Sequence, residues 1–477
     1  MTTTDTRARW LALIVLCLGD LMIVVDATIV NVALPSIRDD LGFSETSLAW
    51  VVNAYLLTFG GFLLLGGRFG DLFGQRKLFL IGIAAFTAAS IACGLSNTQG
   101  LLIGARAVQG LGGAVVSAVA LSLIMTLFTD PGERTKAMGV FGFVMAGGGS
   151  IGVLAGGVLT DLLSWHWIFL VNVPIGVAVF VLTLRLLPDV PGRAGGRLDI
   201  AGALTVTGAL MLAVYAIVNG NDKGWTSAQT LGLLGAAVAL MATFLVLESK
   251  VAAPLVPLVI LKLRNIWASN VVGVLWAGGM FAWFFLSALY LQLVLGYSPL
   301  QVGLAFLPAN VIMGIFSIGL SAKLVMRFGI KPPLAAGLGL AAVGLLLFAR
   351  APVDGNFALD VLPSMILLGF GAGMAFNPVL LAAMSDVAPE ESGLASGIVN
   401  TAFMMGGALG LAVLASLADW RTDSLGGADD PSALTSGYHL AFVVGAAFAL
   451  GAAVVGATLL RTPAAAAQEP AVAGAVH

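Results

Sequence analysis

The sequence predicts an all-α polytopic membrane protein in which fourteen transmembrane helices form two groups of six around a central pair. Of its 477 residues 59% are hydrophobic, the mean hydropathy is +1.03 and only 10% are charged. A soluble domain carries about 25% charged residues. Long apolar stretches recur along the whole chain, and Lys and Arg are concentrated in alternate loops between them.

Each apolar stretch is long enough to cross a bilayer as a helix, which takes about 20 apolar residues, and too long for the strands of a membrane barrel. An even number of crossings places both ends of the chain on one side of the membrane. The fourteen predicted spans are residues 10–34, 47–67, 78–96, 100–126, 137–160, 168–187, 199–218, 228–247, 268–293, 302–326, 333–350, 359–384, 393–418 and 437–460.

The basic residues predict the orientation. If the N-terminus is cytoplasmic, seventeen of the 22 Lys and Arg residues fall in cytoplasmic segments, and one, Arg106, falls within a span. Cytoplasmic loops of membrane proteins carry such an excess of positive charge. We therefore expect a multi-pass protein of the cell membrane with both termini in the cytoplasm. The four basic residues left outside are Arg38, Lys223, Arg350 and Arg421.

The loops between the spans are short, and the two longest cytoplasmic joints lie near residues 188–198 and 248–267. These joints bracket a two-span hairpin. We predict an N-terminal six-helix half at 1–187, a linker with a two-helix insertion at 188–265, a C-terminal six-helix half at 266–461 and a disordered tail at 462–477.

Several function classes are disfavoured by what the sequence lacks. It has no phosphate-binding loop of the type Gly-x-x-x-x-Gly-Lys-Ser/Thr, and no segment is large enough for a soluble catalytic domain. The three histidines are far apart, so no metal site, cofactor site or enzymatic centre is expected, and no repeated filter sequence suggests a channel. Cys17 and Cys93 both lie in apolar spans and are expected to be free thiols.

Asp26 lies inside the first apolar span. A carboxylate near the centre of a membrane helix costs roughly 2.5 to 3.5 kcal/mol, so an acid in this position is a functional candidate for ions, protons or a cationic ligand. Asp20 is a second acid six positions earlier, about 120° away around the helix. It is either a second proton carrier or cation-binding acid, or a polar residue in a water-filled vestibule.

Arg106 belongs to the segment Arg-Ala-Val-Gln-Gly in the fourth span, with Gln109 and Gly110. Arg106 lies about 6 residues inside the outer edge of its span and Asp26 about 8, which are depths of roughly 9 and 12 Å. The two side chains can therefore meet. Because the proton affinity of a carboxylate depends on burial and on neighbouring charge, movement relative to Arg106 would let Asp26 load and release a proton. The alternative is a fixed ion pair that only holds helices together.

The loop after the second span reads Gly-x-x-x-Asp-x-x-Gly-x-Arg-Lys. Its glycines permit a tight backbone reversal, and the acid can cap a helix or pair with a base. A weaker copy, residues 322–331, follows the second span of the last six. The alternative is a positively charged cytoplasmic turn without a special role. The residues concerned are Gly67, Asp71, Gly74, Arg76 and Lys77.

The fifth span carries glycines at intervals that allow close contact with another helix. Small-residue packing alone would also produce such a stripe. The glycines are Gly139, Gly148, Gly152, Gly156 and Gly157.

With these motifs, residues 10–460 resemble the major facilitator superfamily, in particular its fourteen-span drug:proton antiporter family. Asp26 to Pro35 is similar to that family's first-span signature, and Arg106, Gln109 and Gly110 match its Arg-x-x-Gln-Gly. The resemblance implies two six-helix major-facilitator bundles plus a central two-helix insertion. It also implies that the loop from Gly67 to Lys77 is a conformational latch and that the span-five glycines form an antiporter motif, although Val153 stands where the motif has proline.

The function expected from this resemblance is a secondary active transporter that exports lipophilic drugs or antibiotics in exchange for protons, with Asp26, Arg106 and Asp20 as candidate coupling residues. The alternative is an exporter dedicated to one endogenous metabolite or self-made antibiotic. The expected partners are the lipid bilayer, a lipophilic small molecule and protons, with no nucleic acid and no cofactor, and the protein is expected to be a monomer. Aromatic and amide side chains within spans are candidate substrate contacts: Asn31, Tyr55, Gln109, Trp283, Tyr290 and Asn310.

Overall fold

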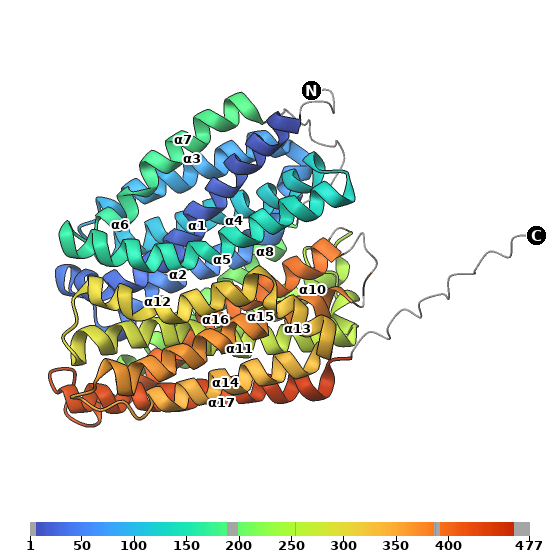
Figure 1. The fold of residues 1–477 in the computed structure, drawn as a ribbon. Helices are drawn as coiled ribbons and strands as arrows, with labels where there is room; N and C mark the ends of the chain where they lie inside the picture. Colours follow the sequence, from blue (N-terminus) through green and yellow to red (C-terminus); the bar gives the residue numbers. More distant parts are fainter. Residues whose placement is uncertain (1–5, 188–198, 253, 386, 388–391, 462–477) are drawn as a thin grey trace, which may run out of the picture.

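The computed structural model describes residues 6–187, 199–252, 254–385, 387 and 392–461, and all regular structure in them is helical. The N-terminal helices form one bundle and the C-terminal helices a second bundle beside it (Figure 1). Thirteen of the described helices are long and apolar enough to cross a membrane. The fourteenth crossing is the shorter α12, which continues through a π-helical turn into α13 over the span predicted at 302–326. The predicted fold class is confirmed.

The first bundle contains six crossings, the last of which is broken near Val171 into two helices, α6 and α7. Its helices are α1 Thr6–Leu41, α2 Glu45–Phe73, α3 Gln75–Gly94, α4 Gln99–Leu127, α5 Pro131–Leu162, α6 Trp167–Leu170 and α7 Asn172–Leu186.

The second bundle also contains six crossings. Its helices are α11 Arg264–Leu289, α12 Pro299–Ile315 with α13 Ser321–Phe328, α14 Lys331–Phe348, α15 Leu362–Met384, α16 Ser392–Asp423 and α17 Pro431–Leu459.

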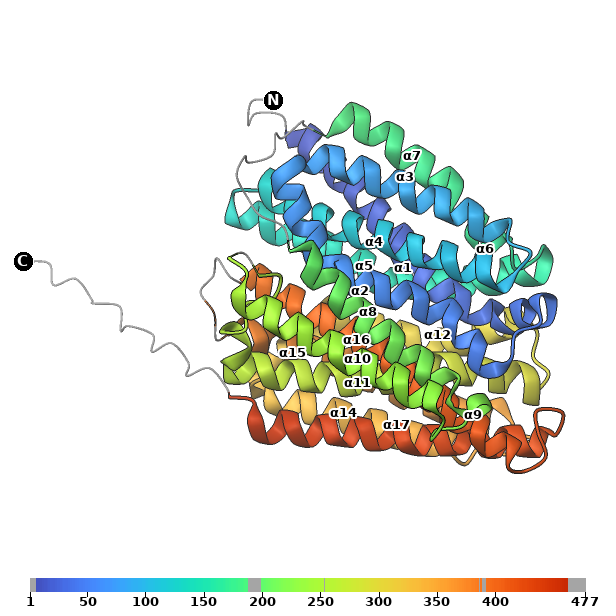
Figure 2. The ribbon, with the colours of Figure 1, turned by 180° about the vertical axis from the view of Figure 1, so that it is seen from behind.

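The inserted pair is α8 Ile200–Val218 and α10 Ala228–Lys250, joined by the short α9 Gly220–Lys223. Figure 2 views the molecule from behind and shows this pair on the side toward the viewer. There α8 contacts α2 of the first bundle and α16 of the second. The approach of α8 to α2 is close because the Thr207 side chain packs directly on Gly61. The insertion therefore bridges the two bundles on one side.

Local sequence accounts for where several helices begin. Ser44 accepts a hydrogen bond from the backbone N–H of Ser47 and so caps α2, and Thr98 caps α4 in the same way through Leu101. Asp130 caps α5, whose first residue is a proline. Caps of this kind satisfy the backbone donors that the first turn of a helix leaves free.

The two bundles meet along two seams. On one side α2 packs against α16, and a Cβ on Gly60 would lie 3.0 Å from Met404 Cβ. On the other side α5 packs against α12, and a Cβ on Gly157 would lie 3.0 Å from Leu300 Cα. Small residues thus allow the bundles to approach closely at both seams.

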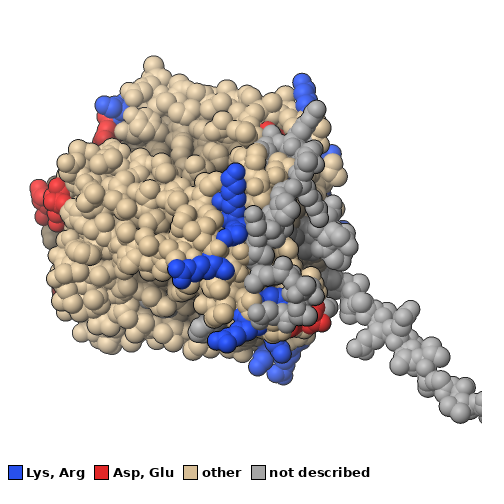
Figure 3. Space-filling model, turned by 90° about the horizontal axis from the view of Figure 1, so that it is seen from above, with Lys and Arg blue, Asp and Glu red and all other residues tan. Residues whose placement is uncertain are grey.

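The beginning of α1 and the end of α17 lie at the same end of the molecule (Figure 1), which we call the terminal end. Most of the face seen in Figure 3 is tan, and most of the Lys and Arg side chains visible on it lie on the half nearer the terminal end. This is the surface of a multi-pass membrane protein. The domain boundaries stay predictions, and residues 188–198 and 462–477 lie outside the described residues.

Candidate functional site

Asp26 is held in the interior of the first bundle by three side chains. Its Oδ2 lies 2.5 Å from Nη1 of Arg106, while its Oδ1 accepts hydrogen bonds from Gln109 Nε2 at 2.7 Å and Asn172 Nδ2 at 2.8 Å. All four residues are 0% exposed. The prediction that Asp26 and Arg106 lie at depths where they can meet is confirmed.

Gln109 links this acid to the third helix. Its Nε2 also lies 2.8 Å from Ser90 Oγ, and its Oε1 accepts a hydrogen bond of 2.7 Å from Arg106 Nη1. The Ser90 hydroxyl in turn donates to the carbonyl of Phe86 within α3. Gln109 therefore fixes the acid and the base relative to each other and ties both to α3.

Arg106 is oriented by the second helix. Its Nε donates to the carbonyl oxygen of Val51 at 2.9 Å, and its guanidinium lies 4.3 Å from the centre of the Tyr55 ring. A cation over an aromatic face is attracted by the ring quadrupole. Its Nη2 has no hydrogen-bond partner among the described residues.

Together these contacts join the Asp26 carboxylate of α1 to side chains or carbonyls of α2, α3, α4 and α7. A change in the charge of Asp26 alters the strength of its ion pair with Arg106 and of the hydrogen bonds that it accepts from two amides. The acid is 0% exposed, so it does not contact water in this structure.

Asp20 lies deeper along α1, toward the terminal end, and is also 0% exposed. Ser117 Oγ donates a hydrogen bond of 2.5 Å to its Oδ1, and its Oδ2 has no partner among the described residues. Both acids therefore contact α4, which also carries Arg106. The two acids contact this same helix although they lie about 120° apart around α1.

The loop between α2 and α3 contains a single turn residue. Gly74 has φ of 94°, a conformation that favours glycine, and its backbone N–H donates to the carbonyl of Gly70. Gly67 was expected to take part in the same reversal but lies within α2, which continues to Phe73, with Ala118 of α4 as its nearest neighbour. Gly329 in the second bundle has φ of 79° at the corresponding turn, in agreement with the internal repeat.

The charged residues of this loop have different surroundings. Arg76 donates through Nη2 to the carbonyl of Leu184 in α7, at 2.5 Å. Lys77 is exposed. The side chain of Asp71 lies outside the described residues. The role of the loop as a latch stays a prediction.

Four of the five span-five glycines pack against other helices. Gly148, Gly152 and Gly156 face α1, and a Cβ on Gly152 would lie 2.7 Å from the carbonyl oxygen of Val25. Gly157 faces α12 across the seam between the bundles, whereas Gly139 has no atom within 4 Å of the position of a Cβ. The stripe therefore places α5 between α1, which carries Asp26, and the second bundle.

The candidate substrate contacts do not form one cluster among the described residues. Tyr55 and Gln109 belong to the Asp26 site, whereas the Tyr290 hydroxyl donates to the carbonyl of Pro352 in a loop. Asn310 is buried in α12. Trp283 of α11 packs against Phe284 and Phe306, and the amide of Asn31 donates to Thr28 of its own helix. Their roles stay predictions.

Two residues of the site were missed by sequence reasoning. Asn172 is a polar residue inside a predicted apolar span, and this signal was sufficient to mark it as a candidate. Ser90 gave no comparable signal, because a serine in a membrane helix commonly bonds to its own backbone.

Comparison with known proteins identifies the family. The family profile described as Major Facilitator Superfamily matches residues 16–411. The puromycin resistance protein pur8 of Streptomyces alboniger is 40% identical over 94% of this chain and 90% of its own length. The cephamycin export protein CmcT of Amycolatopsis lactamdurans is 37% identical over 95% of this chain and 93% of its own length. The tetracenomycin C resistance and export protein of Streptomyces glaucescens is 34% identical over 86% of this chain and 76% of its own length.

Among solved structures, that of the nucleoside transporter NupG superposes with a TM-score of 0.63 over 94% of this chain and 100% of that chain, at 13% identity. This likeness concerns the fold. Together with the profile match and the two-bundle architecture, it confirms the resemblance found in the motifs. The chain belongs to the Major Facilitator Superfamily and is a transport protein, not an enzyme.

Proposed function

We propose that the protein exports lipophilic drugs or antibiotics in exchange for protons and that Asp26 carries the proton. The observation that supports this proposal best is the buried contact between Asp26 and Arg106, which together with the hydrogen bonds around it joins an acid of α1 to four other helices of the first bundle. The names of the relatives, which include resistance and export proteins for several antibiotics, support the substrate class.

The proposed cycle uses the charge of Asp26 as a switch. Protonation from the outer side neutralises the carboxylate and removes the attraction that holds it to Arg106. The Arg106 guanidinium is then left without its counterion inside a dry bundle, which is unfavourable and drives a rearrangement of α1 against α4. Release of the proton inward restores the carboxylate, and cargo is captured in the same stage of the cycle.

The available energy is sufficient for resistance. One charge moved through 100 mV supplies about 2.3 kcal/mol. Since about 1.4 kcal/mol corresponds to a tenfold ratio, this supports a cargo gradient of roughly 40- to 50-fold without ATP.

The glycine stripe of α5 supports a rocking movement of the bundles. Gly152 and Gly156 bring α5 close to α1, next to the acid, and Gly157 brings the same helix close to α12 of the other bundle. A movement of α1 is therefore passed on to the seam by a helix that contacts both. Asp20 contacts the same α4 and is a candidate second carrier.

The narrower alternative is an exporter of one endogenous metabolite or self-made antibiotic. Its support is that several relatives are named for one compound each, such as puromycin or cephamycin. Efflux measured for a panel of unrelated lipophilic compounds separates the two: the broad exporter extrudes many of them and the dedicated exporter extrudes one.

We also propose that the protein lies in the cell membrane as a monomer with the terminal end in the cytoplasm, and that it needs no cofactor and binds no nucleic acid. The distribution of Lys and Arg supports this orientation. A cysteine introduced in the C-terminal tail would be labelled by an impermeant maleimide only after the cells are opened. Labelling of intact cells would contradict the orientation.

The test of export is the accumulation of puromycin in cells that produce the wild type or Asp26→Asn, with and without an uncoupler. The wild type is expected to lower accumulation only while the proton gradient exists. Asp39→Asn, the same change on the exposed end of the same helix, is the matched control and is expected to behave as the wild type. Extrusion that is insensitive to the uncoupler would contradict proton exchange.

A further inference from the structure

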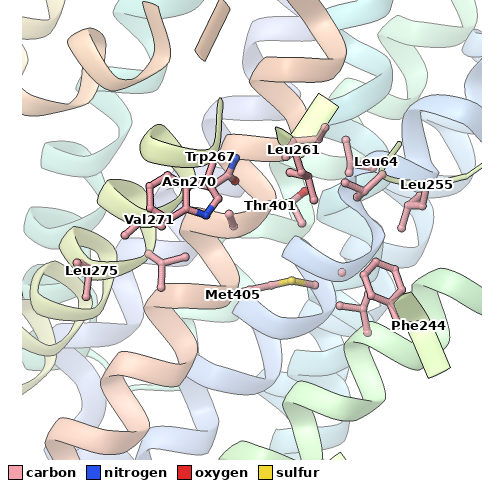
Figure 4. Close-up of a pocket in the computed structure, with 16 residues that line it drawn as sticks. Leu64, Phe244, Leu255, Leu261, Trp267, Asn270, Val271, Leu275, Thr401 and Met405 are labelled. Atoms are coloured by element: carbon pink, nitrogen blue, oxygen red, sulfur yellow. The ribbon is translucent and has the colours of Figure 1, made fainter. Parts of the chain in front are cut away.

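A cavity of about 440 Å³ lies where the inserted helix pair meets both bundles (Figure 4). Side chains from five helices line it: α2 of the first bundle, α8 and α10 of the insertion, and α11 and α16 of the second bundle. The segment after α10 contributes Leu255, Val256 and Leu261 to its wall. We call this space the insertion pocket. Its volume lies within the range of about 300 to 1,000 Å³ found for small-molecule sites.

The walls of the insertion pocket are almost entirely apolar. Among the described residues no charged side chain lines it, and Asn270 and Thr401 are the ones that contribute polar groups beside the indole of Trp267. The Thr401 hydroxyl is buried and has no hydrogen-bond partner among the described residues. A buried polar group without a partner is unfavourable by about 1 to 3 kcal/mol.

The insertion pocket borders the seam between the bundles. Gly61 of α2 lines it, while the adjacent Gly60 packs on Met404 of α16 at that seam. The lining residues belong to the parts of their helices nearer the terminal end: Leu64 late in α2 and Trp267 early in α11 are examples. Trp267 is 48% exposed, so one wall of the pocket reaches the surface of the molecule.

The Asp26 site has the opposite character. Asp26 and its partners are charged or strongly polar and are 0% exposed, so an apolar molecule in the membrane has no direct contact with them. The chain thus separates a sealed, charged site in the first bundle from an open, apolar pocket at the seam. The pocket lies toward the terminal end, at the level of the leaflet on that side of the membrane.

We propose that the insertion pocket binds uncharged lipophilic molecules from that leaflet and is an entry site next to the α2–α16 seam. This inference rests on the proposed export function and names where its cargo first binds. Two sources share the required chemistry, a dissolved lipophilic compound and the acyl chain of a bilayer lipid. The proposal requires that a dissolved compound occupies the pocket.

The test uses cysteine protection in the full-length protein. Cys17 and Cys93 are buried, so the wild type gives a low background of labelling. Ala402→Cys places a thiol in the wall of the pocket, and its rate of reaction with N-ethylmaleimide is measured with and without the neutral dye Nile red. At a dye concentration of about ten times its Kd, a site that the dye occupies reacts about tenfold more slowly.

A second apolar groove offers a matched control. It lies between α3 and α4, has a volume of about 400 Å³ and is lined by Ala88, far from the seam in the fold. Ala88→Cys is expected to react at the same rate with and without the dye. Equal protection at both positions, or none at either, would overturn the proposal.

The two sources are distinguished by repeating the measurement in detergent and in phosphatidylcholine nanodiscs. Protection of Ala402→Cys by Nile red in both media supports the proposal. The contrary result is slow labelling in nanodiscs and fast labelling in detergent, with no effect of the dye in either medium. It would identify an acyl-chain site and overturn the proposal.

Failure of this proposal differs from failure of the export function. The double variant Asp26→Asn with Ala402→Cys is expected to keep protection by Nile red, because the pocket does not contain the acid. If Nile red gives no protection while proton-driven efflux is intact, the entry-site proposal is refuted and the export function is not. Intact protection with efflux that does not respond to the proton gradient refutes proton exchange alone.

Discussion

Asp26 and Arg106 are 80 positions apart in the sequence, yet Oδ2 of the acid lies 2.5 Å from Nη1 of the base, and neither side chain is exposed. A pair buried in this way contributes little net stability, because both charges lose their hydration. Removal of one partner is nevertheless strongly unfavourable, since the other charge then remains buried alone. This asymmetry makes the pair suitable for a switch that is operated by one proton.

Gln109→Leu tests whether the amide between these charges positions them. The change leaves Asp26, Arg106 and Ser90 each with one hydrogen bond fewer, at about 1 to 3 kcal/mol for a buried group left unpaired. We expect a lower melting temperature of the purified protein and slower efflux. Gln99→Leu is the control, because the Gln99 amide donates to the carbonyls of Leu41 and Gly42, outside the Asp26 site. Efflux at the wild-type rate in Gln109→Leu would show that the amide has no part in positioning.

Substitution by alanine is expected to have opposite effects on stability at two glycines of α5, Gly152 and Gly139. In Gly152→Ala the new methyl group would lie 2.7 Å from the Val25 carbonyl oxygen and still closer to the Thr28 hydroxyl. Overpacking of this kind costs about 1 to 3 kcal/mol, so we expect a lower melting temperature and reduced transport.

In Gly139→Ala the new methyl group has no packing neighbour within 4 Å among the described residues, and the change gains up to about 1 kcal/mol of helix propensity. It is therefore the matched control and is expected to be at least as stable as the wild type. Equal losses in the two variants would refute the role of Gly152 in the contact between α5 and α1.

Gly74→Ala tests the turn between α2 and α3. Gly74 has φ of 94° and ψ of 124°, a conformation that costs an alanine about 1 to 3 kcal/mol. Gly67→Ala introduces a methyl group into a regular helix whose nearest neighbour, Ala118 Cβ, is 3.9 Å away, and is expected to be tolerated. Thermal unfolding of both variants checks this. If the alanine at 67 were the more harmful change, the two glycines would have been assigned to the wrong structural roles.

Most of the fold was predictable because a membrane leaves few alternatives. A span that crosses lipid must satisfy its own backbone hydrogen bonds, so an apolar stretch of sufficient length is a helix. Sequence reasoning did not find the π-helical turn Phe316–Leu320 between α12 and α13, since glycines such as Gly319 are common in membrane helices. It also placed Gly67 in a turn, although α2 extends past it.

The site was predictable only in part. Depth along two helices was sufficient to bring Asp26 and Arg106 together, because depth depends on residue number alone. The contacts of Asp26 with Asn172 and of Asp20 with Ser117 depend on how helices are rotated and tilted against one another. The insertion pocket combines residues from five helices, and no single segment of the sequence carries its pattern.

Proton movement in proteoliposomes tests the central claim most directly. Vesicles that enclose a pH-sensitive dye and contain either the wild type or Asp26→Asn receive puromycin, or another lipophilic compound that the wild type extrudes, on one side. We predict that cargo causes the wild type to move protons in the opposite direction, that Asp39→Asn does the same, and that Asp26→Asn folds and binds cargo without moving protons. Cargo-dependent proton flux in Asp26→Asn at the wild-type rate would contradict the role proposed for this acid.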